Sequence, residues 1–209
     1  MEIKIKRFLV ALIGLCVAGV GVGVFLYSNL GVDPASVFQT GLSKQLGISY
    51  GTASALSNLI IIIVILFIDK SYINISTLLA IFSIGYSADF TRTVLNLFIQ
   101  GEMQLLPKLL FILLGCFVMA LGVAVYIKAG LGVGAVDSVS QVISDKLKLD
   151  YKKIRVTSDL LFVLVGTLLG GAVGIGTLVA AFLTGPFIQM IRPKTDPFIQ
   201  AILKNDGGR

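Results

Sequence analysis

A set of polar side chains stands in or beside the apolar segments of this chain, where side chains of these types can bind a small solute or a cation. Carboxylates pair with cations, and amides and hydroxyls hydrogen-bond a solute. An ionised carboxylate within the hydrocarbon of a bilayer costs on the order of 3 kcal/mol, so we expect it to face water, a partner or a substrate. The candidate substrate-binding residues are Asp33, Ser36, Gln39, Asn58, Asp89, Arg92, Asp137, Ser138, Gln141 and Asp159.

Asn58 and Asp159 form an informative pair within this set. Each follows a serine and lies about seven to ten residues into an apolar run, which is roughly 10–15 Å along a helix. An amide at one position and a carboxylate of similar shape at the other indicate that Asp159 supplies a charge, to a cationic solute, a coupling cation or a proton. We therefore predict that Asp159→Asn abolishes ligand binding or transport in a folded protein. The alternative is a structural residue near the cytoplasmic end of its segment.

Asp89 and Arg92 are three residues apart in a third apolar run. Side chains at this spacing lie on one face of a helix, where an ion pair forms easily. Two interpretations remain open, a structural pair that neutralises itself and a pair that contacts a substrate. For the structural pair we expect Asp89→Asn to lower stability, because Arg92 loses its partner.

Motifs of the common enzyme classes are missing from the sequence. It contains no HExxH, no GxSxG and no phosphate-binding loop of the P-loop type. It has no histidine, and its two cysteines, Cys16 and Cys116, lie inside apolar segments. We therefore expect no enzymatic activity, no metal site and no cofactor. Membrane topology accounts for the basic residues, so no nucleic-acid partner is expected.

The composition is that of an integral membrane protein. Hydrophobic residues make up 56% of the chain and charged residues 13%, with a mean hydropathy of +0.96. Runs of about 20 apolar residues match the ~30 Å hydrocarbon core of a bilayer. We predict an all-α polytopic membrane protein, surrounded by lipid, with six transmembrane helices at residues 8–27, 51–68, 75–98, 109–127, 156–171 and 177–191.

Two further segments, 35–46 and 135–147, are predicted to be short helices. Asp33 is a suitable N-cap for the first of them, and Pro34 suits the first helical position. Each segment has an apolar stripe opposite a polar one. Either the polar face lines a central cavity at membrane depth, or the helix lies flat in the membrane interface. Eight spans, with both segments crossing, is a third arrangement, which their length of about 18–20 Å disfavours.

The chain divides into two homologous halves, 1–104 and 105–209. A constant offset of 101 residues aligns glycine and tyrosine residues as well as apolar ones. The residues in register include Gly14 and Gly115, Gly21 and Gly122, Gly31 and Gly132, and Tyr50 and Tyr151. Glycines and alanines in the first and fourth apolar runs have a structural interpretation, since small residues allow close backbone approach between helices.

Three spans in each half place the second half upside down relative to the first. The connector 128–155 is rich in lysine and arginine, whereas its counterpart 28–50 contains only Lys44. Because cytoplasmic loops carry an excess of Lys and Arg, both chain termini are predicted to lie in the cytoplasm. Inverted repeats of this kind are typical of transporters.

The sequence resembles the YitT/YczE family of bacterial membrane proteins. The resemblance rests on the stretch Asn29-Leu30-Gly31-Val32-Asp33-Pro34, followed by Gly41-Leu42-Ser43 and by Gly47-Ile48-Ser49-Tyr50-Gly51-Thr52. It covers essentially the whole chain, although Ala35 stands where many relatives place an aromatic residue. It implies a protein of the bacterial cytoplasmic membrane, in a family for which transport is often suspected, and it implies no particular substrate.

Two classes of function agree with these features. The first is a secondary transporter or exporter of a small molecule, working by alternating access at the interface of the two halves. The second is a membrane binding subunit or accessory protein, such as a vitamin-binding component, that needs partner chains for transport. A homodimer is compatible with either class.

Overall fold

The computed structural model describes residues 2–99, 101 and 103–204, and all regular secondary structure within them is helical. The predicted all-α fold class is therefore confirmed for this part of the chain, whereas residues 205–209, including the predicted cytoplasmic C-terminus, lie outside it. The elements are α1 (Glu2–Ser28), α2 (Pro34–Leu46), α3 (Tyr50–Asp69), a 3-10 turn η1 (Lys70–Tyr72), α4 (Ile75–Phe98), α5 (Leu105–Lys128), α6 (Ala135–Leu147), α7 (Tyr151–Leu168) and α8 (Ile175–Lys204).

Four of the helices, α1, α3, α5 and α8, are long and apolar enough to cross a membrane. The other two long helices, α4 and α7, are more polar. Asp89 and Arg92 interrupt α4, while α7 has only 18 residues and carries Arg155 and Asp159. The count of six spans therefore stays a prediction for α4 and α7.

Large apolar side chains cover much of the outer surface, while several polar side chains are buried. Phe67 and Phe98 are 89% and 81% exposed at the outer surface, whereas Asn58 and Gln39 are each only 5% exposed. Soluble proteins rarely expose large contiguous apolar surfaces, but a hydrocarbon surrounding favours them. With its apolar helices, this surface makes the chain a membrane protein.

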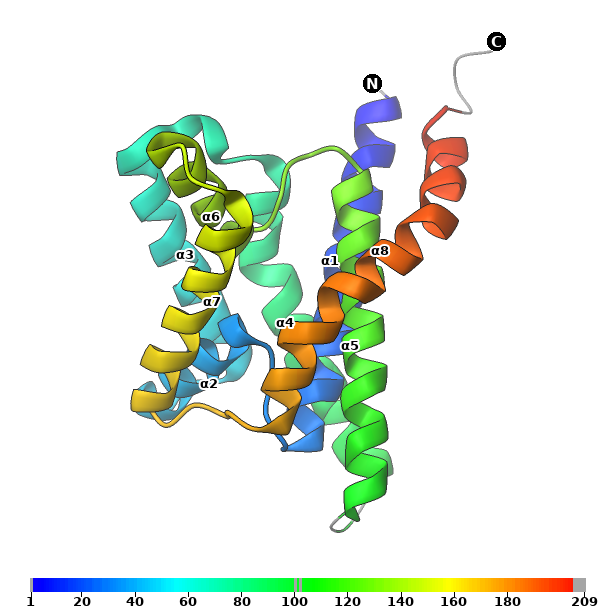
Figure 1. Cartoon of the computed structure of the whole chain (residues 1–209). Coiled ribbons are helices and arrows are strands. Elements are labelled where there is room, and N and C mark those ends of the chain that lie inside the picture. Colours follow the sequence, from blue (N-terminus) through cyan, green and yellow to red (C-terminus); the bar gives the residue numbers. More distant parts are fainter. Residues whose placement is uncertain (1, 100, 102, 205–209) are drawn as a thin grey trace.

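Contacts between helices divide the described chain into two groups. In the first, α1 packs on α4 and α5, and α5 packs on α8. In the second, α2 and α6 each pack on both α3 and α7. Contact between α3 and α4 joins the groups, and Figure 1 shows the second group to the left of α1, α5 and α8. Each group contains two helices from each half of the sequence.

The central helices α1 and α5 pack backbone against backbone. A Cβ atom added at Gly14 would lie 2.6 Å from the backbone nitrogen of Tyr126, and one at Gly21 would collide with the backbone of Met119. At Gly122, an added Cβ would meet α1 in the same way. Such close approach compensates for the weak drive to associate that apolar helices have in lipid. Close backbone approach at these glycines is as predicted from the sequence, and the structure shows that α1 and α5 are the partners.

Both short helices lie within one residue of their predicted bounds, and the start of α2 is capped as its local sequence predicts. The Asp33 carboxylate accepts a hydrogen bond from the Ser36 backbone N–H at 3.3 Å, and Pro34 is the first residue of α2. Gly47 follows the last residue of α2 and Lys148 that of α6, both in the left-handed conformation. Each helix has 13 residues, about 20 Å, so neither crosses a ~30 Å hydrocarbon core alone.

The segment before each short helix pairs with the start of a long helix from the other half of the sequence. The Gly176 N–H, in the first turn of α8, donates to the Leu30 carbonyl at 2.8 Å. The Ser76 N–H, in the first turn of α4, donates to the Leu131 carbonyl at 3.1 Å. Figure 1 shows α2 in the lower half of the molecule and α6 in the upper half. Each half of the sequence thus holds the other's short helix in place.

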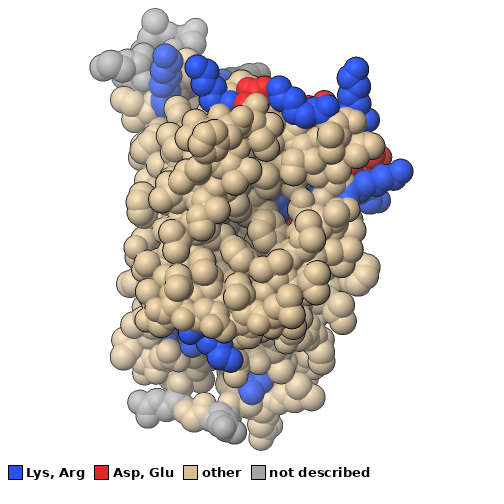
Figure 2. Space-filling model, turned by 90° about the vertical axis from the view of Figure 1, so that its left-hand side faces the viewer, with Lys and Arg blue, Asp and Glu red and all other residues tan. Residues whose placement is uncertain are grey.

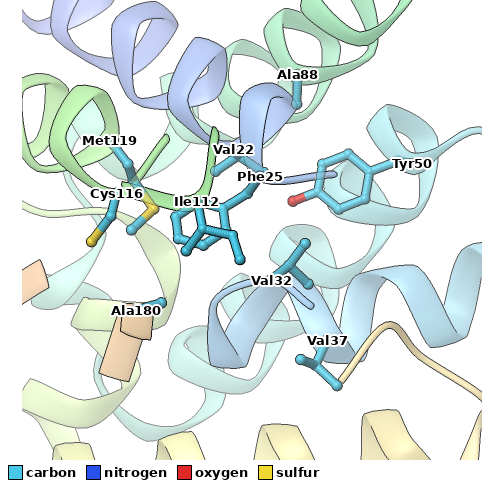
Figure 3. Close-up of a cluster of buried hydrophobic side chains, with 10 residues drawn as sticks. All are labelled: Val22, Phe25, Val32, Val37, Tyr50, Ala88, Ile112, Cys116, Met119 and Ala180. Atoms are coloured by element: carbon cyan, nitrogen blue, oxygen red, sulfur yellow. The ribbon is translucent and has the colours of Figure 1, made fainter. Parts of the chain in front are cut away.

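A buried apolar cluster fills the space between the central helices and α2. Phe25 is fully buried in it, with Val32 and Val37 from the α2 side and Ile112 from α5. Figure 3 shows these side chains converging, with the ring of Tyr50 at the edge of the cluster. The cluster anchors the start of α2 against α1 and α5.

Basic side chains gather at one end of the molecule. Figure 2 shows most of the lysine and arginine side chains of the face in view at its upper end, which is the end where α1 begins in Figure 1. Two ion pairs join elements there, Lys146 with Asp69 at 2.7 Å and Lys128 with Asp196 at 3.1 Å.

Candidate functional site

A cavity of about 200 Å³ lies between the two groups of helices. The first residues of both short helices face it, and every long helix contributes to its wall. Its polar lining residues are Asp33, Ser36, Gln39, Tyr50, Ser54, Asn58, Tyr126, Asp137, Arg155 and Thr184, and its apolar wall includes Ala18, Val22, Ile84, Met119, Val123 and Ile188. Polar groups converging in an apolar cavity are the usual arrangement of a small-molecule site.

Asp33 faces the cavity from the turn between α1 and α2. One carboxylate oxygen, Oδ2, caps α2 through the Ser36 N–H, whereas the other, Oδ1, is buried without a hydrogen-bond partner in the described structure.

The hydroxyl of Tyr50 connects two polar side chains of α2. It donates a hydrogen bond to Gln39 Oε1 at 2.7 Å and lies 2.8 Å from the Ser36 hydroxyl. Tyr50 is the first residue of α3, so these bonds fix the face that α2 turns towards the cavity. Ser54, also on α3, lines the cavity, and its buried hydroxyl has no hydrogen-bond partner among the described residues.

On the α6 side, Arg155 lies between two carboxylates. Its Nη1 pairs with Asp137 Oδ1, and its Nε donates to Asp159 Oδ2 at 3.3 Å. The Tyr126 hydroxyl donates to the second oxygen of Asp137 at 3.0 Å. Asp137 and Arg155 line the cavity, whereas Asp159 lies behind Arg155 and outside the lining.

Of the remaining candidates on α3 and α6, one lines the cavity and two do not. Asn58 lines the cavity and donates to the Ala80 carbonyl of α4 at 3.3 Å. Ser138 is buried beside the cavity, where its hydroxyl lies 3.4 Å from that of Thr77, and it is not a lining residue. Gln141 is exposed on the outer side of α6. The polar face of α6 therefore reaches the cavity only at its first turn.

The expected ion pair between Asp89 and Arg92 does not form in the described structure, so that prediction is wrong. Asp89 Oδ2 instead accepts a hydrogen bond from the Gly51 N–H at 2.7 Å, and Arg92 is exposed. The first N–H groups of a helix have no partner within it, and the close approach of α3 and α4 at Gly85 brings Asp89 to them. Neither Asp89 nor Arg92 lines the cavity.

The sequence interpretation missed five of the polar lining residues, Tyr50, Ser54, Tyr126, Arg155 and Thr184. Arg155 had a usable signal, since it stands four residues before Asp159, a spacing that favours an ion pair on a helix. Tyr126 had none, because it reaches its acceptor on α6 only through the tertiary packing of α5. No group of three His, Cys, Asp or Glu side chains in the described ranges is arranged to hold a metal ion.

A family model matches residues 5–193 of this chain, under the description "Family of unknown function (DUF6198)". The chain belongs to this family. The match covers all eight α-helices except the end of α8 and the first residues of α1. It therefore includes every residue that lines the cavity.

Three relatives span most of the chain. An "Uncharacterized protein" of Haemophilus influenzae is 28% identical over 184 residues, covering 88% of this chain and 82% of the relative. The "Uncharacterized membrane protein YczE" of Bacillus subtilis is 26% identical, and the match covers 87% of this chain and 83% of the relative. The "Uncharacterized protein YyaS" of the same organism is 26% identical, and the match covers 87% of this chain and 90% of the relative. No solved structure matches. The resemblance to YczE seen in the sequence is confirmed.

Proposed function

We propose that this protein is a secondary transporter that moves a small solute across the cytoplasmic membrane through the cavity between its two helix groups. One observation carries the proposal: α2 and α6, which come from different halves of the sequence, both begin at the same cavity. Short helices that start at a buried site near the middle of a membrane are a recurring feature of transporter binding sites. In this proposal α2 and α6 enter the membrane from opposite sides, and α4 and α7 complete six spans.

The reciprocal contacts of the two halves support an inverted repeat. The Leu30 carbonyl, before α2, accepts a hydrogen bond from the start of α8, and the Leu131 carbonyl, before α6, accepts one from the start of α4. Each half of the sequence therefore makes the same contact with the other half. Figure 1 shows α1 and α5, the first long helices of the halves, running in opposite directions. The end rich in lysine and arginine in Figure 2 is placed in the cytoplasm by the positive-inside rule.

Alternating access then follows from how the cavity is built. One wall comes from α1, α4, α5 and α8 and the other from α2, α3, α6 and α7, with direct contact between the groups concentrated at α3 and α4. Rocking of one group against the other about this contact opens the cavity first to one side of the membrane and then to the other.

The test uses single cysteines in a background that lacks Cys16 and Cys116. Ser54→Cys reports on the cavity, while Ser49→Cys and Lys148→Cys report on the two connectors. With an impermeant charged thiol reagent applied to right-side-out and inside-out vesicles, the connectors are expected to react from opposite sides. Ser54→Cys is expected to react from both sides.

Each cysteine can contradict a different part of the proposal. Reaction of Ser49→Cys and Lys148→Cys from the same side would contradict the inverted repeat and favour eight spans. Reaction of Ser54→Cys from one side only would contradict alternating access. It would favour the second class of function, a binding subunit that depends on partner chains.

A further inference from the structure

Asp33 is the carboxylate of the cavity that has no cationic partner. Within the described chain it forms no ion pair, and its buried Oδ1 accepts no hydrogen bond. The basic side chain in the cavity lining, Arg155, is already engaged by Asp137 and Asp159. Burying a carboxylate is costly unless a cation or hydrogen-bond donors pair with it. A ligand that carries a positive charge or a hydrogen-bond donor would supply this partner to the free oxygen of Asp33.

The charges around the cavity favour a cation. Asp33 and Asp137 line the cavity, and Asp159 contacts the lining residue Arg155 from outside it. Among the described residues in and next to the lining, three carboxylates therefore outnumber the single guanidinium of Arg155. An anionic ligand would face this excess of negative charge. A cation in the cavity reduces this excess.

The rest of the lining favours an organic cation with N–H donors and a short apolar part. Ser54 is only 1% exposed and lines the cavity, and its hydroxyl has no partner among the described residues, so it can offer a second acceptor. Val22 and Met119 contribute apolar wall. The volume of about 200 Å³ lies below the ~300 Å³ at which sites for drug-sized ligands begin.

We propose that the cavity binds a small primary amine in its ammonium form, with Asp33 as the anionic anchor and Ser54 as an additional acceptor. This inference rests on the proposed function, in which the same cavity is the transport site. It assigns recognition of charge to Asp33 rather than to Asp159, whose carboxylate is held by Arg155.

Asp33→Asn separates the charge of Asp33 from its structural role. Asparagine caps a helix about as well as aspartate, so the bond to the Ser36 N–H is kept while the negative charge is removed. Asp89→Asn is the matched control, because Asp89 lies on α4 outside the cavity lining.

Binding is measured by titration calorimetry on the purified, detergent-solubilised full chain, with n-butylammonium chloride as the probe and n-butanol as its uncharged counterpart. We expect the wild-type protein and Asp89→Asn to bind n-butylammonium equally and n-butanol far more weakly. We expect Asp33→Asn to bind n-butylammonium about thirtyfold or more weakly, since it loses one partner of a buried charge pair. Ser54→Ala is expected to weaken binding by about fivefold, as for loss of one hydrogen bond.

A second measurement does not depend on whether Asp33→Asn folds. In the Ser54→Cys protein, n-butylammonium should slow the reaction of the cysteine with the thiol reagent, and n-butanol should not. Absence of n-butylammonium binding to the wild-type protein, equal binding by Asp33→Asn, or equal protection by n-butanol would each overturn the inference. Binding in detergent needs no transport, so one-sided labelling of Ser54→Cys would remove the transport proposal and leave the amine site standing.

Discussion

Replacing Arg155 with glutamine tests whether the α6 side of the cavity is held together by charge. The guanidinium pairs with Asp137, at the start of α6, and with Asp159, one turn further along α7. Removing it leaves two carboxylates facing each other without a cation, next to a cavity and within an apolar surrounding. We expect the mutation to loosen the contact between α6 and α7 and to lower the stability of the whole chain.

The size of the effect follows from the burial of the three side chains. Breaking a fully buried pair by removing one partner costs about 3–5 kcal/mol. Here Arg155, Asp137 and Asp159 are 32%, 28% and 26% exposed, so water relieves part of that cost. A loss of about 2–3 kcal/mol is therefore expected, which for a chain of this length corresponds to a melting temperature lower by about 5–10 °C.

The chain carries its own reporter for this measurement. In a background that lacks Cys16, which is partly exposed, Cys116 is fully buried in α5 and becomes reactive towards a thiol-specific fluorophore when the helices separate, so fluorescence during heating gives the melting temperature. Arg92→Gln is the matched control, because Arg92 is exposed and forms no ion pair in the described structure. Adding Asp159→Asn to Arg155→Gln should restore part of the loss. Equal melting temperatures for Arg155→Gln and Arg92→Gln, or no recovery in the double variant, would refute the reasoning.

Two further predictions concern packing and the start of α3. Gly21→Val should lower stability by about 3 kcal/mol or prevent folding, because the added side chain collides with the backbone of α5. Gly185→Val is the control, since Gly185 has open space around it and the variant should behave as wild type. Gel filtration and melting temperatures compare the two variants, and equal results would contradict the close packing of α1 and α5. Asp89→Ala should lower stability by about 1–2 kcal/mol by leaving the Gly51 N–H without its acceptor. An unchanged melting temperature would show that this hydrogen bond contributes nothing.

The amino-acid sequence alone determined the membrane class and most of the local structure. Hydropathy and length identify the long helices, because the bilayer imposes the same requirement on every spanning segment. Asp33 and Pro34 gave the start of α2 correctly, since capping depends on residues within one turn of each other. Glycines in the apolar runs indicated close helix packing, because only small residues allow helix backbones to touch, whereas the pairing of α1 with α5 comes from the structure.

The tertiary structure decided which polar side chains share the cavity. Asp33 and Asp137 are brought together because each short helix is held by elements of the other half of the sequence, an exchange that no local pattern records. Gln141 and Asp159 have the chemistry of site residues, yet the rotation of α6 turns Gln141 outward and Arg155 engages Asp159. Asp89 pairs with the start of α3 rather than with Arg92, because the contact of α3 with α4 offers it the free N–H groups of a helix end. The partner of a buried charge is set by which helices pack side by side, and that packing depends on contacts between residues far apart in the chain.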